Sequence, residues 1–443
     1  MSIKPKLNFL DITMAVVSLV IGIGIFRTPS IVAQNTGNTL LFFTAWILGG
    51  FIAMMGGLVF AEIGSRKPLA GGFYKIVSEV YHPSIGFMLN WVYFFINCAS
   101  FAAVCLIGSE YLCYILPINE EYLTIYIKLI SICVTLLLFI INFIGIKMGS
   151  IALNIITFLK ISMILLFSIL AFVFSIENGA NQNIDISHIS SGNPILALGT
   201  GLIAVFFTYG GYQMTMNLCS DVLKPKRNIP LGIFTGIIII TTLYLLIITG
   251  YYTLLGFEGI AQSDLIAVDM AKAIFGDTGK KLISIVIFIS ILGFLNATLL
   301  QMPRALYAMS EDNILPSIFM KINSKTQVQE FTLIFITALV IIFILIYGSF
   351  EKIISMLIYN ETIIIGIFAS TIFVLRKKVN VKLDKKDNFN HPFYTYLPII
   401  FLSFLLLVII SAFVDNIISS LISTLFLLIG YPVYLILKKL NNK

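Results

Sequence analysis

The sequence has few charged residues: 11% of its 443 residues are Asp, Glu, Lys or Arg, whereas 59% are hydrophobic. Soluble globular domains typically carry about 25% charged and about 45–50% apolar residues. The longest polar breaks, near residues 177–193, 257–280 and 376–392, are too short to form a separate soluble domain. These shortages exclude a soluble protein and predict a single domain, residues 1–443, embedded in a membrane.

Histidine and cysteine are scarce too. The three histidines, His82, His188 and His391, fall in loops or at span ends and have no Cys, Asp or Glu at ligand spacing. The five cysteines are odd in number and lie in or beside apolar stretches, which favours small buried side chains over a disulfide framework. A membrane-embedded enzyme would need a nucleophile–base pair or a metal cluster at span depth. We therefore expect no metal, no cofactor and no enzymatic activity.

Long apolar stretches, in contrast, recur along the whole chain. One membrane crossing needs roughly 20 predominantly apolar residues. The sequence therefore predicts an all-α integral membrane protein with twelve transmembrane helices. These predicted spans are Phe9–Gln34, Thr39–Ile63, Pro83–Gly108, Leu123–Ile146, Ile151–Ile176, Pro194–Cys219, Pro230–Leu255, Leu282–Ala308, Phe331–Tyr347, Ser349–Leu375, Phe393–Phe413 and Ile417–Leu437.

The positions of lysine and arginine predict the orientation, because cytoplasmic loops carry an excess of both. Most of the 28 basic residues fall in cytoplasmic loops if both chain termini lie inside the cell. Because they sit in short loops next to the membrane, the net charge of +7 indicates contact with lipid headgroups rather than with nucleic acid. The exceptions are Lys128, Lys272, Lys280, Lys281 and Lys352, which face out, and Arg27 and Lys160, which lie within spans.

Two of the predicted spans are interrupted. Span one contains GIGIFRTPS (Gly22–Ser30), and span six contains FFTYGGYQ (Phe206–Gln213). Glycines alone could simply let helices pack closely. Two interruptions five spans apart, however, indicate a transporter of two inverted five-helix repeats, a LeuT-like fold with its substrate site at the bilayer midplane. The repeats would be residues 9–176 and 194–375, followed by helices eleven and twelve in residues 393–437.

The interruptions also predict binding chemistry. Irregular backbone at membrane depth is tolerated only where it lines a cavity or is buried in protein. A half-helix that begins near Ile25 would point free amides and a positive dipole end at an anion such as a carboxylate. Carbonyls that end the other half-helices, near Val20 and Phe207, would suit an ammonium. A channel would favour a continuous polar path instead of one midplane site.

Several motifs resemble the amino acid–polyamine–organocation family of transporters along almost the whole chain. The first is GIGIF (Gly22–Phe26), although the family's second position is usually small or hydroxylated and here is Ile23. The usual acidic pair after helix six is Ser220–Asp221 in this chain. The other matching stretches are FAEIGSRKPLAGGFYKIVSEVYHPSIGFMLNW (Phe60–Trp91), FFTYGGYQMTMNLCSDVLKPKRNIP (Phe206–Pro230), PRALYAMSEDNILP (Pro303–Pro316) and HPFYTYLP (His391–Pro398).

The resemblance implies a secondary active amino acid transporter of the bacterial cytoplasmic membrane, similar to the L-type amino acid transporter branch and without an obligatory protein partner. Transport would be exchange; the alternatives are proton symport and the carriage of polyamines or other amines. Phe207 would cap the occluded substrate from outside. The implied substrate contacts are Val20, Ile21, Gly22, Ile23, Gly24, Ile25, Phe207 and Gly210, with the carboxylate on the amides of Ile23, Gly24 and Ile25 and the ammonium on the carbonyls of Val20, Phe207 and Gly210. Candidate specificity residues are Thr208, Tyr209, Asn296 and Tyr359, each of which could equally be an ordinary helix contact.

Lys160 lies about ten residues into span five, roughly 15 Å deep at 1.5 Å per residue. An ionisable residue at that depth is a functional candidate. Its position resembles the lysine that, in sodium-independent members of the family, places its ammonium where sodium-coupled relatives hold an ion between helices one, five and eight. Transport is therefore expected to be independent of sodium. If Lys160 instead loses its proton during the cycle, the carrier would be a proton symporter; a lysine in a water-filled crevice is a further reading.

Arg27 and Glu361 are the other two ionisable residues within spans. Arg27 lies roughly 10 Å and Glu361 roughly 18 Å below the outer ends of spans one and ten. By analogy with relatives of this fold, we expect them to form an outer gate with Phe207, pairing when the vestibule closes. Alternatively, Arg27 reaches the outer headgroups and Glu361 binds a proton or the substrate's amine.

Overall fold

The computed structural model describes residues 5–69, 71–113, 115–116, 120–177, 193–346, 351–378, 395–415 and 417–441. Within these residues the chain is helical, and its one β contact is an isolated bridge between Leu7 and Val222. The helices are α1 (Phe9–Val20), α2 (Thr28–Thr36), α3 (Thr39–Arg66), α4 (Gly72–Val80), α5 (Pro83–Cys113), α6 (Leu123–Ile144), α7 (Ile146–Glu177), α8 (Pro194–Thr208), α9 (Pro225–Gln262), α10 (Ile266–Phe275), α11 (Asp277–Glu311), α12 (Glu330–Ile346), α13 (Glu351–Lys378), α14 (Tyr396–Asp415) and α15 (Ile417–Asn441), with 3-10 helices η1 (Gly24–Phe26), η2 (Glu120–Tyr122), η3 (Tyr212–Asp221) and η4 (Ser317–Met320).

Ten helical stretches in the described residues are long and apolar enough to cross a membrane. The first predicted span is divided between α1 and α2, and the ninth corresponds to α12, which is only 17 residues long. The all-α prediction is confirmed for the described residues, whereas the number of twelve crossings stays a prediction. The structure also adds two short helices that the sequence did not indicate, α4 and α10.

Asparagine and proline mark the starts of several helices. Asn8 caps α1, since its side chain accepts a hydrogen bond from the Asp11 amide while the Asp11 carboxylate accepts one from the Asn8 amide. Asn38 caps α3 by accepting from the Leu41 amide at 2.8 Å. Asn193 caps α8, where Pro194 occupies the first turn. These residues satisfy or remove amides that a helix start leaves unpaired.

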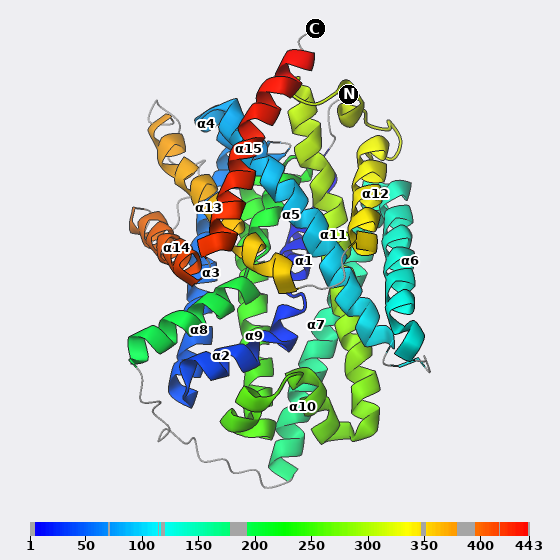
Figure 1. The fold of residues 1–443 in the computed structure, drawn as a ribbon, viewed down its shortest axis with the longest axis vertical. Helices are drawn as coiled ribbons and strands as arrows, with labels where there is room; N and C mark the ends of the chain where they lie inside the picture. The colour runs from blue at the N-terminus through cyan, green and yellow to red at the C-terminus, as the bar shows by residue number, and fades with distance from the viewer. Residues whose placement is uncertain are drawn as a thin grey trace.

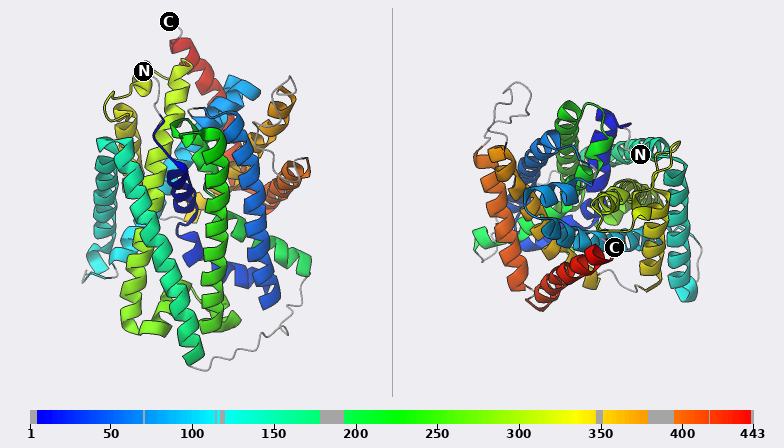
Figure 2. Two further views of the ribbon diagram at one scale, coloured as in Figure 1. Left: turned by 180° about the vertical axis from the view of Figure 1, so that it is seen from behind. Right: turned by 90° about the horizontal axis from the view of Figure 1, so that it is seen from above.

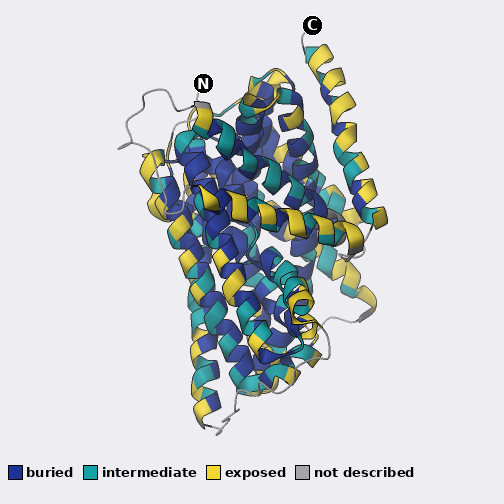
Figure 3. Cartoon of the chain, turned by 90° about the vertical axis from the view of Figure 1, so that its left-hand side faces the viewer, coloured by how far each residue is buried: buried dark blue, intermediate teal, exposed yellow. Residues whose placement is uncertain are grey.

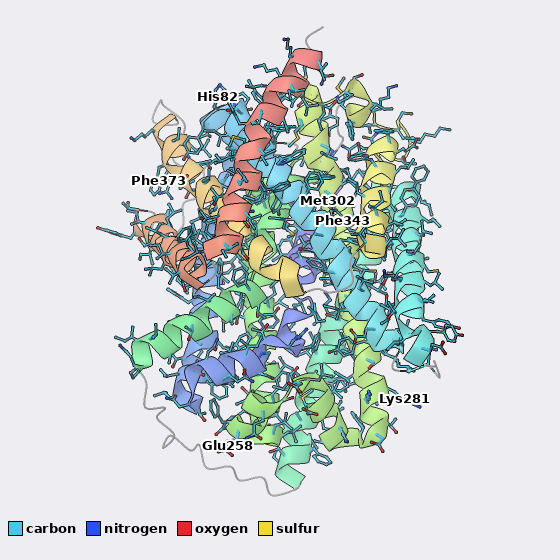
Figure 4. All side chains as sticks on the ribbon, viewed as in Figure 1. His82, Glu258, Lys281, Met302, Phe343 and Phe373 are labelled. Atoms are coloured by element: carbon cyan, nitrogen blue, oxygen red, sulfur yellow. The ribbon has the colours of Figure 1, made fainter. Side chains whose placement is uncertain are left out.

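The helices form one elongated bundle. Figure 1 shows the described chain starting and ending at the same end of the bundle, which we call the N-terminal face, while α10 lies at the opposite end, the far face. Glu258 and Lys281 also lie at the far face, in Figure 4. Seen from above in Figure 2, α14 and α15 form one flank and α6 the opposite flank.

Side chains at the centre of the bundle are buried, whereas many side chains on its flanks are exposed. In Figure 3 the middle of the bundle is dark blue, whereas exposed residues run along the outer helices. Leu421, Leu425 and Leu428 of α15 and Leu406 and Leu407 of α14 are large apolar side chains that are more than half exposed. A contiguous apolar surface of this kind on an otherwise well-packed bundle indicates a lipid-facing flank.

Helix α1 lies at the centre, packed against α9, α7, α11 and η3. Close approach to α9 is possible because a Cβ atom on Gly236 would lie 2.6 Å from Val16 Cγ1, and one on Gly232 would lie 2.6 Å from Ile12 Cγ2. Small residues that bring helix backbones together are common where transmembrane helices pack. The first interruption, which follows α1 directly, is therefore enclosed by other helices.

The contact of α4 with η3 depends on a glycine. A Cβ atom on Gly72 would lie 2.1 Å from the backbone oxygen of Met216, which cannot move without displacing η3. We predict that Gly72→Ala destabilises the protein by about 1–3 kcal/mol, as overpacking does elsewhere. The measurement is thermal unfolding of the purified protein in detergent. Gly199→Ala is the matched control, because nothing lies within 4 Å of a Cβ atom there, and equal unfolding temperatures of the two variants would contradict the prediction.

Candidate functional site

The first helix break is a short irregular segment between α1 and α2. Helix α1 ends at Val20, Ile21 adopts φ −75° and ψ 86°, and one 3-10 turn, η1, precedes Arg27. Helix α2 begins at Thr28 with Pro29 in its first turn. The sequence placed the restart of the helix near Ile25, so the α-helix begins slightly later than predicted, because the 3-10 turn comes first.

The second break lies between α8 and η3. The Gly210 amide donates to the Phe207 carbonyl at 3.1 Å, and Gly211 has φ +117°, a conformation that favours glycine. A Cβ atom on Gly211 would lie 2.4 Å from the Leu19 carbonyl oxygen, so this glycine also allows the two breaks to touch. A Cβ atom on Gly24 would likewise lie only 3.2 Å from Thr208 Cγ2, so this glycine also lets the two breaks approach closely. The breaks therefore form one continuous site.

Three consecutive amides of the first break are open. The Phe26 and Arg27 amides donate to the Ile23 and Gly24 carbonyls, and the Gly22 amide donates to the Val20 carbonyl at 2.8 Å. Among the described residues, the amides of Ile23, Gly24 and Ile25 have no acceptor. Unpaired amides next to a helix start attract anions, because their dipoles and the helix dipole point the same way.

Part of the break is accessible to solvent although its surroundings are buried. Gly22, Ile23, Gly24, Phe207 and Gly210 are partly exposed. Nothing lies within 4 Å of a Cβ atom built on Gly22, so open space adjoins the segment. The open amides and this space together can receive a small ligand that carries a carboxylate.

Tyr244 of α9 connects the two breaks. Its hydroxyl lies 3.2 Å from the Val20 carbonyl oxygen and 3.0 Å from the Thr208 carbonyl oxygen, one acceptor from each break. The ring is fully buried and packs against Tyr209 and Trp46. The sequence alone did not indicate a role for Tyr244. A tyrosine in an apolar span signals that its hydroxyl needs a partner, but the sequence does not indicate which partner.

Lys160 of α7 reaches the other side of the first break. Its Nζ donates to the Ile21 carbonyl at 2.5 Å and to the Ser18 carbonyl at 3.3 Å, and the side chain is fully buried. Ser290 of α11 donates to the same Ile21 oxygen at 3.4 Å, and Gly293 of α11 faces the ammonium. Within the described residues no carboxylate contacts the ammonium. The charge is therefore placed among α1, α7 and α11, where it fixes the end of α1.

The four candidate specificity residues lie in different surroundings. Tyr209 is buried and donates to the Trp46 carbonyl at 3.4 Å, and the Thr208 hydroxyl donates to the Ala204 carbonyl at 3.0 Å. Asn296 bonds to Asn142 of α6 and to the Gly149 carbonyl of α7. The ring of Tyr359 packs against α14, and its hydroxyl accepts from Thr424 of α15. Thr208 and Tyr209 thus belong to the second break, whereas the contacts of Asn296 and Tyr359 connect helices to one another.

Arg27 and Glu361 are not brought together. Arg27 is exposed between η1 and α2. The Glu361 carboxylate of α13 accepts from Gln213 Nε2 at 2.9 Å, and Gln213 is the second residue of η3, directly after the second break. The outer gate of Arg27, Glu361 and Phe207 therefore stays a prediction, and Gln213 is a contact of Glu361 that the sequence did not indicate.

Buried amide side chains continue from the breaks toward the N-terminal face. Asn217 of η3 donates to Gln301 of α11 at 2.6 Å, and Gln301 donates to Asn97 of α5 at 3.4 Å. The Asn217 side-chain oxygen accepts from the Phe73 amide of α4 at 3.4 Å. This amide chain ties η3 to three other helices.

Ion pairs close the N-terminal face. Arg304 of α11 donates to Asp221 at 2.8 Å and to Gln329 at 2.6 Å, and both members of the Arg304–Asp221 pair are buried. The Asp221 carbonyl also accepts from the amides of Lys6 and Leu7. Pairs of this kind hold elements in position and can be broken when the elements move apart.

Further ion pairs lie at the same face, and two of them join different helices. Glu62 of α3 is fully buried and pairs with Arg66 and with Arg376 of α13, at 2.9 and 2.6 Å. On α4, Lys75 pairs with Asp312, to which the Tyr74 hydroxyl also donates at 2.8 Å. Burial and the hydrogen bond to Asp312 raise the pKa of Tyr74 above its ordinary value. For Lys75, burial lowers the pKa, but the hydrogen bond and charge of Asp312 outweigh it and the pKa rises.

Comparisons with known proteins identify the family of the chain. The family model described as "Amino acid permease" matches residues 7–437. The chain is similar to the serine/threonine exchanger SteT of Bacillus subtilis (strain 168), with 28% identity over 99% of this chain and 98% of that protein. It is also similar to the human b(0,+)-type amino acid transporter 1, with 24% identity over 85% of this chain and 77% of that protein, and to the human cystine/glutamate transporter, with 26% identity over 85% and 75%.

The family match covers nearly the whole chain, and the relatives are transporters rather than enzymes. The resemblance to the amino acid–polyamine–organocation group is thereby confirmed. The helical bundle, with its many apolar helices and two opposed helix breaks, is an architecture suited to that activity. The chain belongs to the amino acid permease family of membrane transporters.

Proposed function

We propose that this protein is a sodium-independent amino acid exchanger that works by alternating access as a single polypeptide. Its twelve spans would form two inverted five-helix repeats and two further helices, in the cytoplasmic membrane, with the N-terminal face toward the cytoplasm. The observation that carries the proposal is the pair of touching helix breaks with three open amides beside open space. Helix breaks in corresponding positions of two halves are the signature of such carriers.

The substrate would bind with its two charged ends on the two breaks. The α-carboxylate would accept hydrogen bonds from the amides of Ile23, Gly24 and Ile25, which lack acceptors in the described chain. The α-ammonium would donate to the carbonyls of Val20 and Phe207, at the ends of α1 and α8. The remaining contact, the Gly210 carbonyl, lies in the second break, where partly exposed Phe207 would cap the ligand.

Lys160 supports independence from sodium. Its ammonium already donates to the Ile21 and Ser18 carbonyls, which are the kind of oxygen ligands that a small cation would require. A second cation in the same position would meet strong repulsion in a site without a neighbouring carboxylate. The absence of a carboxylate partner within the described residues also leaves proton release from Lys160 as a second candidate mechanism, in which the carrier is a proton symporter.

Exchange is supported by a relative whose name describes an exchanger of serine and threonine. In alternating access, the N-terminal face must open on one half of the cycle. The Arg304–Asp221 pair and the chain of Asn217, Gln301 and Asn97 would then separate, because they connect η3 to α11 and α5. A bound substrate would favour this step, whereas the empty carrier would remain closed.

The direct test is transport by the purified chain alone in liposomes. We predict that labelled serine, threonine or alanine enters faster when the liposomes contain an unlabelled amino acid, because return of the carrier requires substrate. Empty liposomes with and without a pH gradient are the control. Uptake that follows only the pH gradient would identify proton symport, and no uptake of any amino acid would refute the proposed function.

The second prediction concerns Lys160. Replacing sodium with choline is expected to leave the exchange rate unchanged. Lys160→Ala is expected to lower the rate about tenfold or more, because hydrogen bonds from a charged group typically contribute about 1.5–3 kcal/mol. Binding and transport assays at equal protein density check this. Strict sodium dependence of the unmodified protein, or full activity of Lys160→Ala, would contradict the assignment.

The third prediction concerns the glycines of the first break. Gly24→Leu fills the space between the open amides and Thr208, where a single Cβ atom would already lie 3.2 Å from Thr208 Cγ2. We expect substrate affinity to fall about tenfold or more, as overpacking of about 1–3 kcal/mol implies. Gly199→Leu in α8 is the control, since the space around Gly199 is open. Unaltered binding by Gly24→Leu would favour a packing role for this glycine.

A further inference from the structure

Glu361 of α13 is held beside the second break by one neutral side chain. Its Oε1 accepts from Gln213 Nε2 at 2.9 Å, and Gln213 Oε1 accepts from the Gly211 amide at 2.9 Å. Because both ends of the Gln213 amide group are used, its NH2 group is fixed toward the carboxylate. The position of Glu361 is thus set by the break itself.

Among the residues that the structure describes, no lysine or arginine pairs with Glu361. Described carboxylates at the N-terminal face, such as Glu62, Asp221 and Asp312, pair with lysine or arginine. Asp11, which has no cation in the described structure, accepts hydrogen bonds from Asn8, Ser150 and Asn154. In that same part of the chain, Glu361 receives its hydrogen bond from Gln213 only.

The second oxygen of Glu361 is open. The residue is partly exposed, and Oε2 is neither hydrogen-bonded nor enclosed among the described residues. Since Gln213 is buried and Tyr93 of α5 lies close enough to interact electrostatically, the carboxylate faces the bundle interior rather than lipid. A carboxylate at this depth is unfavourable unless a positive group compensates it. The accessible oxygen is the place where such a group can bind.

The distance between Glu361 and the second break determines how long a ligand must be for its positive group to reach the carboxylate. Two hydrogen bonds of 2.9 Å and one amide group separate Glu361 Oε1 from the Gly211 nitrogen, so these two atoms lie up to about 8 Å apart. A short side chain, such as that of serine, does not extend that far from the break. The long flexible stem of lysine or the extended guanidinium of arginine does.

We propose that Glu361 is the counter-charge for the side chain of a cationic amino acid, so that the carrier transports lysine, ornithine or arginine as well as neutral substrates. This inference rests on the proposed function, in which the breaks hold the substrate's carboxylate and α-ammonium. The side chain then extends along η3 to Oε2 of Glu361, while Gln213 holds the other oxygen. Lys160 does not compete for the carboxylate, because it donates to carbonyls of α1.

Selectivity between a cationic and a neutral substrate tests the proposal. The full chain in liposomes is assayed for exchange of labelled lysine and labelled alanine, and the ratio of their kcat/KM values is compared among variants. Glu361→Gln is expected to lower the lysine-to-alanine ratio about tenfold or more, because a hydrogen bond to a charged group is lost. Glu361→Asp keeps the charge on a shorter stem, and its ratio is expected to lie between those of the unmodified protein and Glu361→Gln.

Glu258→Gln is the matched control, since Glu258 is exposed at the far face (Figure 4) and its replacement is expected to keep the ratio of the unmodified protein. An unmodified protein that exchanges alanine but not lysine would overturn the inference while leaving the proposed function intact. An unchanged lysine-to-alanine ratio in Glu361→Gln would also overturn the inference. This holds too if the variant loses only the response of alanine uptake to a pH gradient, because Glu361 would then bind a proton instead of the substrate side chain. If no amino acid is exchanged, the proposed function itself fails.

Discussion

The structure depends on how the backbone of α1 is satisfied after the helix stops. Within a membrane, each unpaired amide or carbonyl is unfavourable unless protein or water pairs with it. At the end of α1, Tyr244 contacts the Val20 carbonyl, and Lys160 and Ser290 contact the Ile21 carbonyl. The carbonyls are thus supported by α9, α7 and α11, and the next three amides are left open. The surrounding helices are arranged around this one interruption, and the proposed binding site consists of the backbone groups that it leaves unpaired among the described residues.

Polar groups are paired on one side of the breaks, whereas accessible space adjoins the first break itself. From the breaks to the N-terminal face, amide side chains and ion pairs connect η3 with α5, α11 and α4. Gly22 and Gly24, in contrast, adjoin accessible space. These polar contacts lie beside packed aromatic rings, among them Phe73 of α4 and Phe368 of α13, whose ring centroids are 4.1 Å apart. Opening this face would therefore break polar contacts that water can replace and would also expose apolar surface.

The sequence predicted both breaks and singled out Lys160, which the structure buries beside the first break, because glycine, proline and a lone charge leave a local signal in an apolar run. It also predicted the family, which the comparisons confirm. The partners of polar side chains were not predictable in the same way. Gln213 and Tyr244 contact residues 148 and 224 positions away in the chain, and such contacts depend on how helices rotate and pack. Asn296 and Tyr359 show the same limitation, since a helical pattern gives a face but not the helix that covers it.

The Tyr244 hydroxyl has a consequence for how the two breaks share a ligand. A phenol has one hydrogen, yet this oxygen lies within hydrogen-bonding distance of two carbonyls, those of Val20 and Thr208. At any moment, therefore, one of the two acceptors is without that proton. The Val20 carbonyl keeps the hydrogen bond from the Gly22 amide, at 2.8 Å, in either case. In the proposed binding mode, the ammonium of the substrate would donate to the Val20 carbonyl while the phenol turns to Thr208. The rotation of a single O–H bond would then couple substrate binding at one break to hydrogen bonding at the other.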